Sequence, residues 1–137
     1  MISSTSSPCI GFCSTTYGDD YCRGCYRHVR EVLDWRQLDH AKKELYYYKV
    51  AELALKYMQG KVEVYEPALL RQTCQLKGLP YFEDLNPYYH ILRLLQKGFA
   101  SSLGPESGVI LAPPLTWAQI YKDCDHYIYN QRIQESV

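Results

Sequence analysis

Four cysteines near one end of the sequence constrain what this chain can fold into more than any other feature. They are spaced C-x3-C-x8-C-x2-C, and the four residues are Cys9, Cys13, Cys22 and Cys25. Each closely spaced pair lets two sulfur atoms reach one ion from a single turn of backbone, and a glycine inside each pair relieves crowding in that turn. Two pairs complete a tetrahedral set of thiolates, so the spacing predicts one metal site with these four ligands.

The spacing identifies the ligands better than the metal, because four thiolates suit both a zinc ion and an iron–sulfur cluster. Zinc is favoured by the Arg-Gly sequence between the last two cysteines, which resembles a zinc knuckle, and by the helical pattern of residues 26–35 that follows at once. An iron–sulfur cluster is the alternative, and four unligated thiols are a third, less favoured reading. A complete set of four sulfur ligands leaves no open position for a substrate, so we expect a structural role for either group.

The sequence also favours reduced cysteines. Residues 1–7 have neither the basic nor the apolar stretch of a secretion signal, and no window approaches the roughly 18 apolar residues needed to cross a bilayer. We therefore expect a cytoplasmic protein without a membrane-spanning segment. Cytosolic reductants disfavour a disulfide framework there, which again leaves metal binding as the explanation for clustered cysteines.

Charge and aromatic content indicate which partners to expect. The chain has 15 Lys and Arg against 15 Asp and Glu, and only residues 23–43 are mildly basic. Proteins that neutralise many phosphates usually show a clear basic excess, so nucleic acid is a disfavoured partner. In contrast, 14 Tyr stand against 3 Phe and 2 Trp. Aromatic rings that carry a hydroxyl suit half-wet surfaces, and such surfaces are common where proteins meet other proteins.

Apolar spacing and capping residues predict a mainly α-helical chain, in which a small four-cysteine metal loop is followed by about five helices. The expected helices lie at residues 26–35, 39–58, 68–77, 88–97 and 116–133. Residues 61–65 alternate like a short strand, with Val109–Leu111 as the one evident partner. We divide the chain into the metal module with its following helices, residues 1–58, and a helical C-terminal region, residues 59–137, which we expect to fold largely without the metal.

The residues around the cysteines form an ordered set. Besides the four cysteines it contains Ser7-Pro8, Ile10-Gly11, Arg23-Gly24, Arg27, Glu31-Val32, Trp35 and Leu38-Asp39-His40-Ala41. From Ser7 to Tyr46 this set resembles a family of short bacterial proteins, domain of unknown function 1289, often labelled predicted iron–sulfur proteins. Tyr26 stands where that family often has Gly, and Lys42 where it often has Glu. The resemblance implies a four-cysteine metal module and no particular reaction.

The remaining reactive residues fit structural roles. Cys74 and Cys124 share helix faces with apolar residues, so we expect both in the core. Cys124 and His126 point about 200° apart on a helix, which argues against a catalytic dyad. His28 and His40 flank the metal module and are expected at the surface. With no phosphate loop, nucleophile elbow or metalloprotease motif, an enzyme is the less favoured class, although a site assembled from distant residues would leave no motif.

The tyrosines of the expected helix at residues 39–58 suggest an interaction surface. Tyr46, Tyr47 and Tyr48 span about 200° of its circumference, so at least one must face away from the core. We expect the partner-binding residues to be Tyr47, Tyr48, Lys49 and Lys56. The leading hypothesis is a small metal-stapled helical adaptor that binds an unidentified protein.

Two alternative functions come from other classes of protein. One is an iron–sulfur redox or biogenesis accessory. The other is an RNA- or ribosome-associated zinc module that uses the mildly basic segment, namely Arg23, Arg27, Arg30, Lys42 and Lys43.

Overall fold

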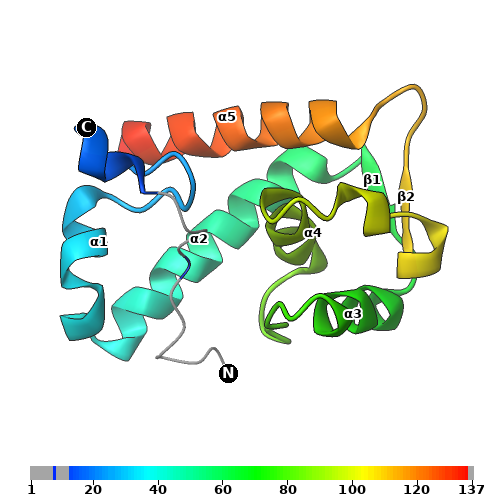
Figure 1. Cartoon of the computed structure of the whole chain (residues 1–137), viewed down its shortest axis with the longest axis horizontal. Helices are drawn as coiled ribbons and strands as arrows, with labels where there is room; N and C mark the ends of the chain where they lie inside the picture. Colours follow the sequence, from blue (N-terminus) through cyan, green and yellow to red (C-terminus); the bar gives the residue numbers. More distant parts are fainter. Residues whose placement is uncertain (1–7, 9–12, 136–137) are drawn as a thin grey trace.

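A computed structural model describes Pro8 and residues 13–135, so Cys9 of the expected ligand set lies outside the described residues. The helices are α1 (Val29–Asp34), α2 (His40–Met58), α3 (Pro67–Leu76), α4 (Pro87–Gln96) and α5 (Trp117–Glu135), and the strands are β1 (Val62–Val64) and β2 (Val109–Leu111). Short 3-10 turns lie at Ser14–Tyr17, Trp35–Gln37, Ala100–Ser102 and Pro105–Ser107. The mainly helical fold predicted from the sequence is confirmed (Figure 1).

Side-chain caps explain where the longer helices begin. Asp39 accepts a hydrogen bond from the backbone of Lys42 at the start of α2, and Asn86 accepts two at the start of α4. Thr116 likewise accepts from the backbone of Gln119 at the start of α5. Each cap satisfies amide groups that the first helical turn leaves without a partner, so these starts follow from local sequence.

The core forms where α2 packs against both α4 and α5 (Figure 1). Its most buried members come from all three helices and include Val50, Ala54, Leu92, Ile120 and Ile128. The same apolar cluster includes Tyr26 and Trp35, which precede α2, as well as Ile128 of α5. The core is therefore continuous across the boundary expected after Met58.

The two strands pair as an antiparallel ribbon, with Val62 opposite Leu111 and Val64 opposite Val109. This bears out the pairing that alternation alone suggested. Beyond the ribbon, Gly108 accepts hydrogen bonds from the backbone of Tyr65 and Glu66 through its carbonyl. Gly108 has φ +81°, and a Cβ at this position would lie 2.1 Å from the Glu66 carbonyl oxygen. Only glycine fits this close approach of two backbone segments.

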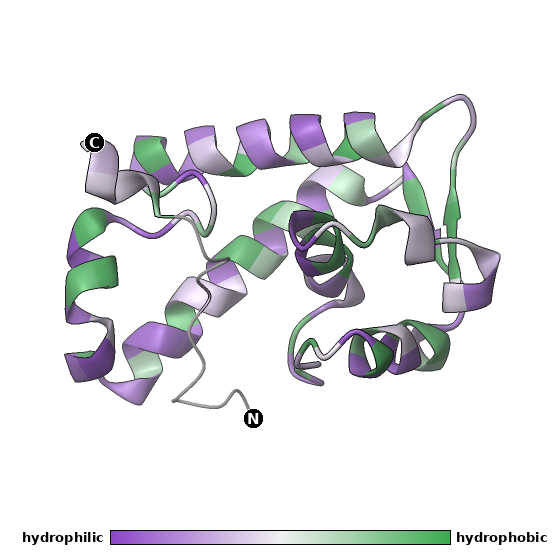
Figure 2. Cartoon of the chain, in the orientation of Figure 1, coloured by the Kyte–Doolittle hydropathy of each residue, from purple (hydrophilic) through white to green (hydrophobic). Residues whose placement is uncertain are grey.

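The two longest helices carry polar residues along their length, as Figure 2 shows for α2 and α5. Among the described residues, no helix combines the length and the apolar character that crossing a membrane requires.

Candidate metal centre

Cys22 and Cys25 lie in one tight, buried turn. An isolated antiparallel bridge between Tyr21 and His28 closes the segment. Inside it, the Cys22 amide donates to the Arg27 carbonyl at 2.8 Å, and the Tyr26 amide donates to the Cys22 carbonyl at 2.8 Å. Both cysteine side chains are nearly inaccessible to solvent. The C-x2-C segment thus forms the single backbone turn that its spacing predicts.

Both sulfur atoms accept hydrogen bonds from groups that favour thiolates. The Gly24 amide donates to Cys22 Sγ at 3.4 Å, and Arg27 Nε donates to Cys25 Sγ at 3.1 Å. The hydrogen bond between the two cysteines lowers the pKa of Cys22 and raises the pKa of Cys25, and burial further raises the latter. The two thiols are therefore close enough for the protonation of one to affect the other, as expected of neighbouring sulfur ligands.

Residues next to the other two cysteines in sequence contact either this turn or α4. Cys13 is half-buried and directly precedes Ser14, whose hydroxyl oxygen accepts from the Arg23 amide at 2.8 Å. Pro8, the residue before Cys9, accepts a hydrogen bond from Arg93 of α4 at 3.2 Å. The segment of Cys13 is thus bonded to the turn that carries the second pair. The Cys13 sulfur itself lies 2.8 Å from Thr15 Oγ1 and does not gather with Cys22 and Cys25.

The complete ligand set stays a prediction. Cys9 lies outside the described residues, and within Pro8 and residues 13–135 no three His, Cys, Asp or Glu side chains gather as a metal would require. The described part nevertheless fits a thiolate-bound metal, because two buried sulfurs share a turn and receive N–H donors. The same donor chemistry suits zinc and an iron–sulfur cluster.

The histidines near the module make other contacts. His28 caps α1 by accepting from the Arg30 amide through Nδ1, and its own amide donates to Glu31. His40 lies 2.6 Å from Glu44, one turn further along α2. Both histidines are thus engaged in local helix contacts.

Tyr26 connects the module to the rest of the fold, a role that its neighbours in sequence do not indicate. Its φ of +65° lies in the left-handed region that favours glycine. The residue is held there because its carbonyl accepts from Arg132 at 2.9 Å and its hydroxyl donates to Asp125 at 2.6 Å. Gln96 of α4 donates to the same hydroxyl at 3.1 Å and to the Gly24 carbonyl at 2.8 Å. The family's frequent glycine at this position was the one sequence signal of a positive φ.

Burial has electrostatic consequences around Tyr26. It raises the pKa of the Tyr26 phenol well above the ordinary value. It also raises the pKa of Asp125, whereas the hydrogen bond from Tyr26 lowers it. Arg132, which donates to the Tyr26 carbonyl, is almost fully buried and pairs with Glu31 at 2.6 Å. These contacts join the cysteine turn, α1 and α5 into one polar network.

The expected partner-binding residues separate into buried and exposed ones. Tyr47 is only 2% exposed and packs against Trp35 and Phe82, so its assignment to a surface was wrong. Tyr48 is 42% exposed, which confirms that one of the three adjacent tyrosines faces outward. The rotation of about 100° per residue carries Tyr47 into the core and Tyr48 out of it. The side chains of Lys49 and Lys56 are exposed enough to contact a partner protein. Each pairs with a nearby acid, Lys49 with Glu135 and Lys56 with Glu52.

The two solitary cysteines lie in the core, as expected. Cys74 is 1% and Cys124 is 0% exposed. Burial raises the pKa of Cys74 to about 11 and that of Cys124 to about 12, so both remain protonated thiols at neutral pH. Asp125, the neighbour of Cys124, is turned toward Tyr26. These residues form packing and hydrogen-bonding groups.

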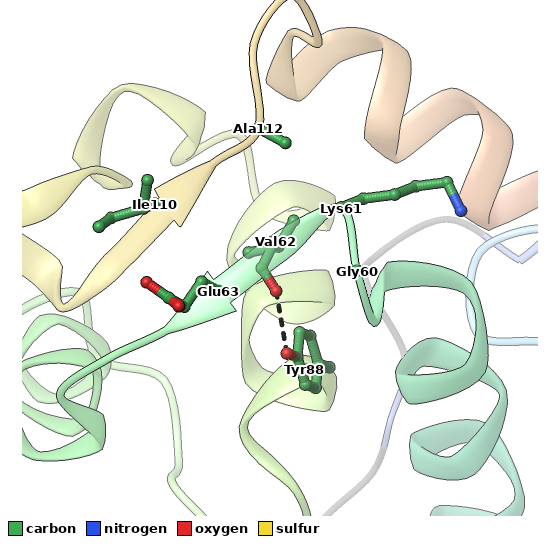
Figure 3. A pocket seen from close by; sticks show the side chains of 7 residues that line it. All are labelled: Gly60, Lys61, Val62, Glu63, Tyr88, Ile110 and Ala112. Carbon is green, nitrogen blue, oxygen red and sulfur yellow. Dashed lines mark hydrogen bonds between the residues drawn. The ribbon is translucent and has the colours of Figure 1, made fainter.

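A hollow beside the strand ribbon has a volume of about 410 Å³. It is lined by Gly60, Lys61, Val62, Glu63, Tyr88, Ile110 and Ala112 (Figure 3). Tyr88 uses its hydroxyl to donate to the Val62 carbonyl, and the charged ends of Lys61 and Glu63 point to opposite sides (Figure 3). Its polar groups do not converge on one point, so the hollow lacks the arrangement typical of a small-molecule site.

Comparison with known proteins supports the resemblance found in the sequence. Residues 7–53 match the model of a family described as Protein of unknown function (DUF1289). The matched segment contains all four clustered cysteines, α1 and most of α2. Neither the curated proteins nor the solved structures match the chain.

Proposed function

We propose that this chain is a metal-stapled helical adaptor, in which Cys9, Cys13, Cys22 and Cys25 hold one zinc ion and the helical body binds another protein. One observation carries the metal part of the proposal. The buried turn of Cys22 and Cys25 receives N–H donors on both sulfurs, and the residues next to Cys9 and Cys13 are tied to it or to α4 beside it. This arrangement suits a closed set of four thiolates.

A closed four-sulfur zinc site would supply a cross-link, because no coordination position remains for a substrate. Hydrogen bonds would connect this cross-link to the helices. Tyr26, between the cysteine turn and α5, is bonded to both Asp125 and Arg132. Metal binding and the ordering of the module are therefore expected to be a single free-energy change.

The adaptor part of the proposal is supported by apolar exposure on α1 and α2. Leu33 is 74%, Leu45 54% and Tyr48 42% exposed. Lys49 and Lys56 lie on the same helix as the last two. Aromatic and aliphatic side chains beside cations are typical of protein-binding surfaces. We assign the interaction to this exposed group in place of Tyr47.

The structure bears differently on the two alternative functions, an RNA-binding module and an iron–sulfur accessory. Of the five cations that an RNA-binding module would use, Arg27 is 3% and Lys43 8% exposed, whereas Arg23, Arg30 and Lys42 are exposed. The burial of two of the five weakens the RNA alternative, as does the balanced net charge. An iron–sulfur accessory needs the same four sulfurs as the zinc protein, so it is retained as the alternative outcome of metal analysis.

Metal analysis of the full chain, purified without oxygen, tests the metal proposal. We expect one zinc per chain and a colourless sample. A variant carrying both Cys22→Ser and Cys25→Ser should lose stoichiometric metal, since it removes half of the ligands. Cys74→Ala is the matched control and should retain the metal, because Cys74 lies in the core of α3. Full retention of the metal by the double variant would contradict the proposal. A brown sample that loses its colour on reduction would show that the four cysteines bind an iron–sulfur cluster and not zinc.

Affinity capture from lysate of the producing cells tests the adaptor proposal. Tyr48→Ala should weaken capture of the partner and leave Tm nearly unchanged, because Tyr48 is exposed. Tyr17→Ala is the control, since Tyr17 is 79% exposed and lies outside α1 and α2. Equal capture by the wild type and by Tyr48→Ala, Leu33→Ala and Leu45→Ala variants would rule out this surface.

A further inference from the structure

Arg27 is a buried cation beside the cysteine turn. Its side chain is only 3% exposed, although arginine is rarely buried without a specific role. Nε donates to Cys25 Sγ at 3.1 Å. The guanidinium lies over the Trp35 ring, 4.9 Å from its centroid. The backbone carbonyl of the same residue accepts from the Cys22 amide. Arg27 is therefore oriented by a ring on one side and by both cysteines on the other.

The negative charge of a four-thiolate centre would explain why a cation is buried beside the cysteine turn. Four thiolates around a divalent ion carry a net charge of −2, and placing that charge in a buried site is unfavourable without compensation. Arg27 brings a positive charge to within hydrogen-bond distance of one of the sulfurs. Lys43 lies over the same Trp35 ring, 5.8 Å from its centroid, and is also buried. Trp35 thus contacts two buried cations, and Arg27 is the one with a hydrogen bond to a cysteine sulfur.

We infer that Arg27 is a positioning residue of the metal centre: its Nε–H orients the Cys25 sulfur, and its guanidinium offsets the negative charge of the thiolates. The inference rests on the proposed metal site and goes beyond it, because it assigns the tightness of metal binding to a residue that is not a ligand. Partners that hydrogen-bond to metal ligands commonly change affinity by about 10- to 100-fold when removed.

The other arginine of the motif provides a matched comparison. Arg23 lies between Cys22 and Cys25 and directly follows Cys22 in sequence. Arg27 lies outside the pair, two residues after Cys25. Its side chain is 62% exposed, pairs with Asp19 at 3.4 Å and lies over the Tyr129 ring. It therefore contacts neither sulfur through the hydrogen bonds seen for Arg27. Proximity in sequence predicts that Arg23 has the larger effect on metal affinity, whereas the structure predicts that Arg27 has it.

The test is a titration of the full-length, metal-free chain with Co²⁺, whose thiolate charge-transfer absorption reports on the sulfur ligands. Wild type should bind one Co²⁺ per chain. Arg27→Gln should bind at least tenfold more weakly, whereas Arg23→Gln should stay within about twofold of wild type. The charge-transfer band of Arg27→Gln should also move to longer wavelength, because loss of an N–H donor raises the energy of the sulfur lone pair. Weaker binding that leaves the surroundings of the sulfurs unchanged would not move the band.

Arg27→Lys separates charge from orientation and covers the case in which Arg27→Gln fails to fold by circular dichroism. It retains the cation over Trp35 but loses the planar fork, so we expect an intermediate affinity with the band still shifted. Wild-type affinity and an unshifted band in both variants would overturn the inference, as would weaker binding without a band shift. Failure of wild type to bind Co²⁺ would overturn the metal site itself, and so is distinguishable from failure of the role of Arg27.

Discussion

Removing the Tyr26 hydroxyl tests whether the cysteine turn is held to the helices in the way the structure shows. In the native fold this hydroxyl is buried, donates to Asp125 at 2.6 Å and accepts from Gln96 at 3.1 Å. Tyr26→Phe keeps the ring and removes only these two hydrogen bonds. The variant therefore isolates the polar connection between the module and α4 and α5.

The size of the effect follows from the two partners. A hydrogen bond to a charged group contributes about 1.5–3 kcal/mol, and the Asp125 carboxylate is left partly buried without this donor. Gln96 loses less, because its amide still donates to the Gly24 carbonyl. We expect the free energy of unfolding to fall by about 2–3 kcal/mol, which corresponds to about 5–10 °C in Tm for a chain of this size.

Urea unfolding followed by circular dichroism at pH 7 and fixed zinc concentration measures this loss. Tyr129→Phe on α5 is the control, with an expected change below about 0.5 kcal/mol, since the described contact of Tyr129 is through its ring with Arg23. A double-mutant cycle with Asp125→Asn should show a coupling of about 1 kcal/mol or more. Additive effects, or a loss below about 0.5 kcal/mol in Tyr26→Phe, would refute the reasoning.

Three further predictions concern other parts of the fold. Burial lowers the pKa of His90 from 6.5 to about 4, so between these values the unfolded chain binds a proton that the folded chain does not. The free energy of unfolding should consequently fall by about 3 kcal/mol as the pH drops through this window, and His90→Gln should flatten that part of a plot of urea midpoint against pH. Tyr47→Ala should lower the free energy of unfolding by about 3–5 kcal/mol, measured by urea unfolding, because Tyr47 is a core residue; a change below about 1 kcal/mol would contradict its burial. Gly108→Ala should lower Tm in a thermal melt, since its Cβ would collide with the Glu66 carbonyl, and an unchanged Tm would show that the close approach is not required.

The cysteine module shows how far local sequence reasoning reaches. The C-x2-C spacing predicted one turn with two neighbouring sulfurs, and the structure has that turn with both side chains buried. The burial of Arg27 was not foreseen, since an arginine near a metal motif is equally suited to solvent or nucleic acid. Its position depends on Trp35, eight residues later, and on the fold that buries them both. Cys9 lies outside the described residues, so its part in the site stays a prediction.

By itself, the sequence determined the features that depend on neighbours along the chain. The helix starts at Asp39, Asn86 and Thr116 follow from side chains that cap the next turn, and alternation between residues 61 and 65 was enough to suggest a strand. Only the tertiary structure decided which of Tyr47 and Tyr48 is buried, because a helix with apolar residues around most of its circumference fits more than one orientation. It likewise decided the contacts of Tyr26 with Asp125 and Arg132, about 100 residues away in sequence. Such contacts form only when α5 packs along α2, and no local pattern specifies which distant side chains that packing brings together.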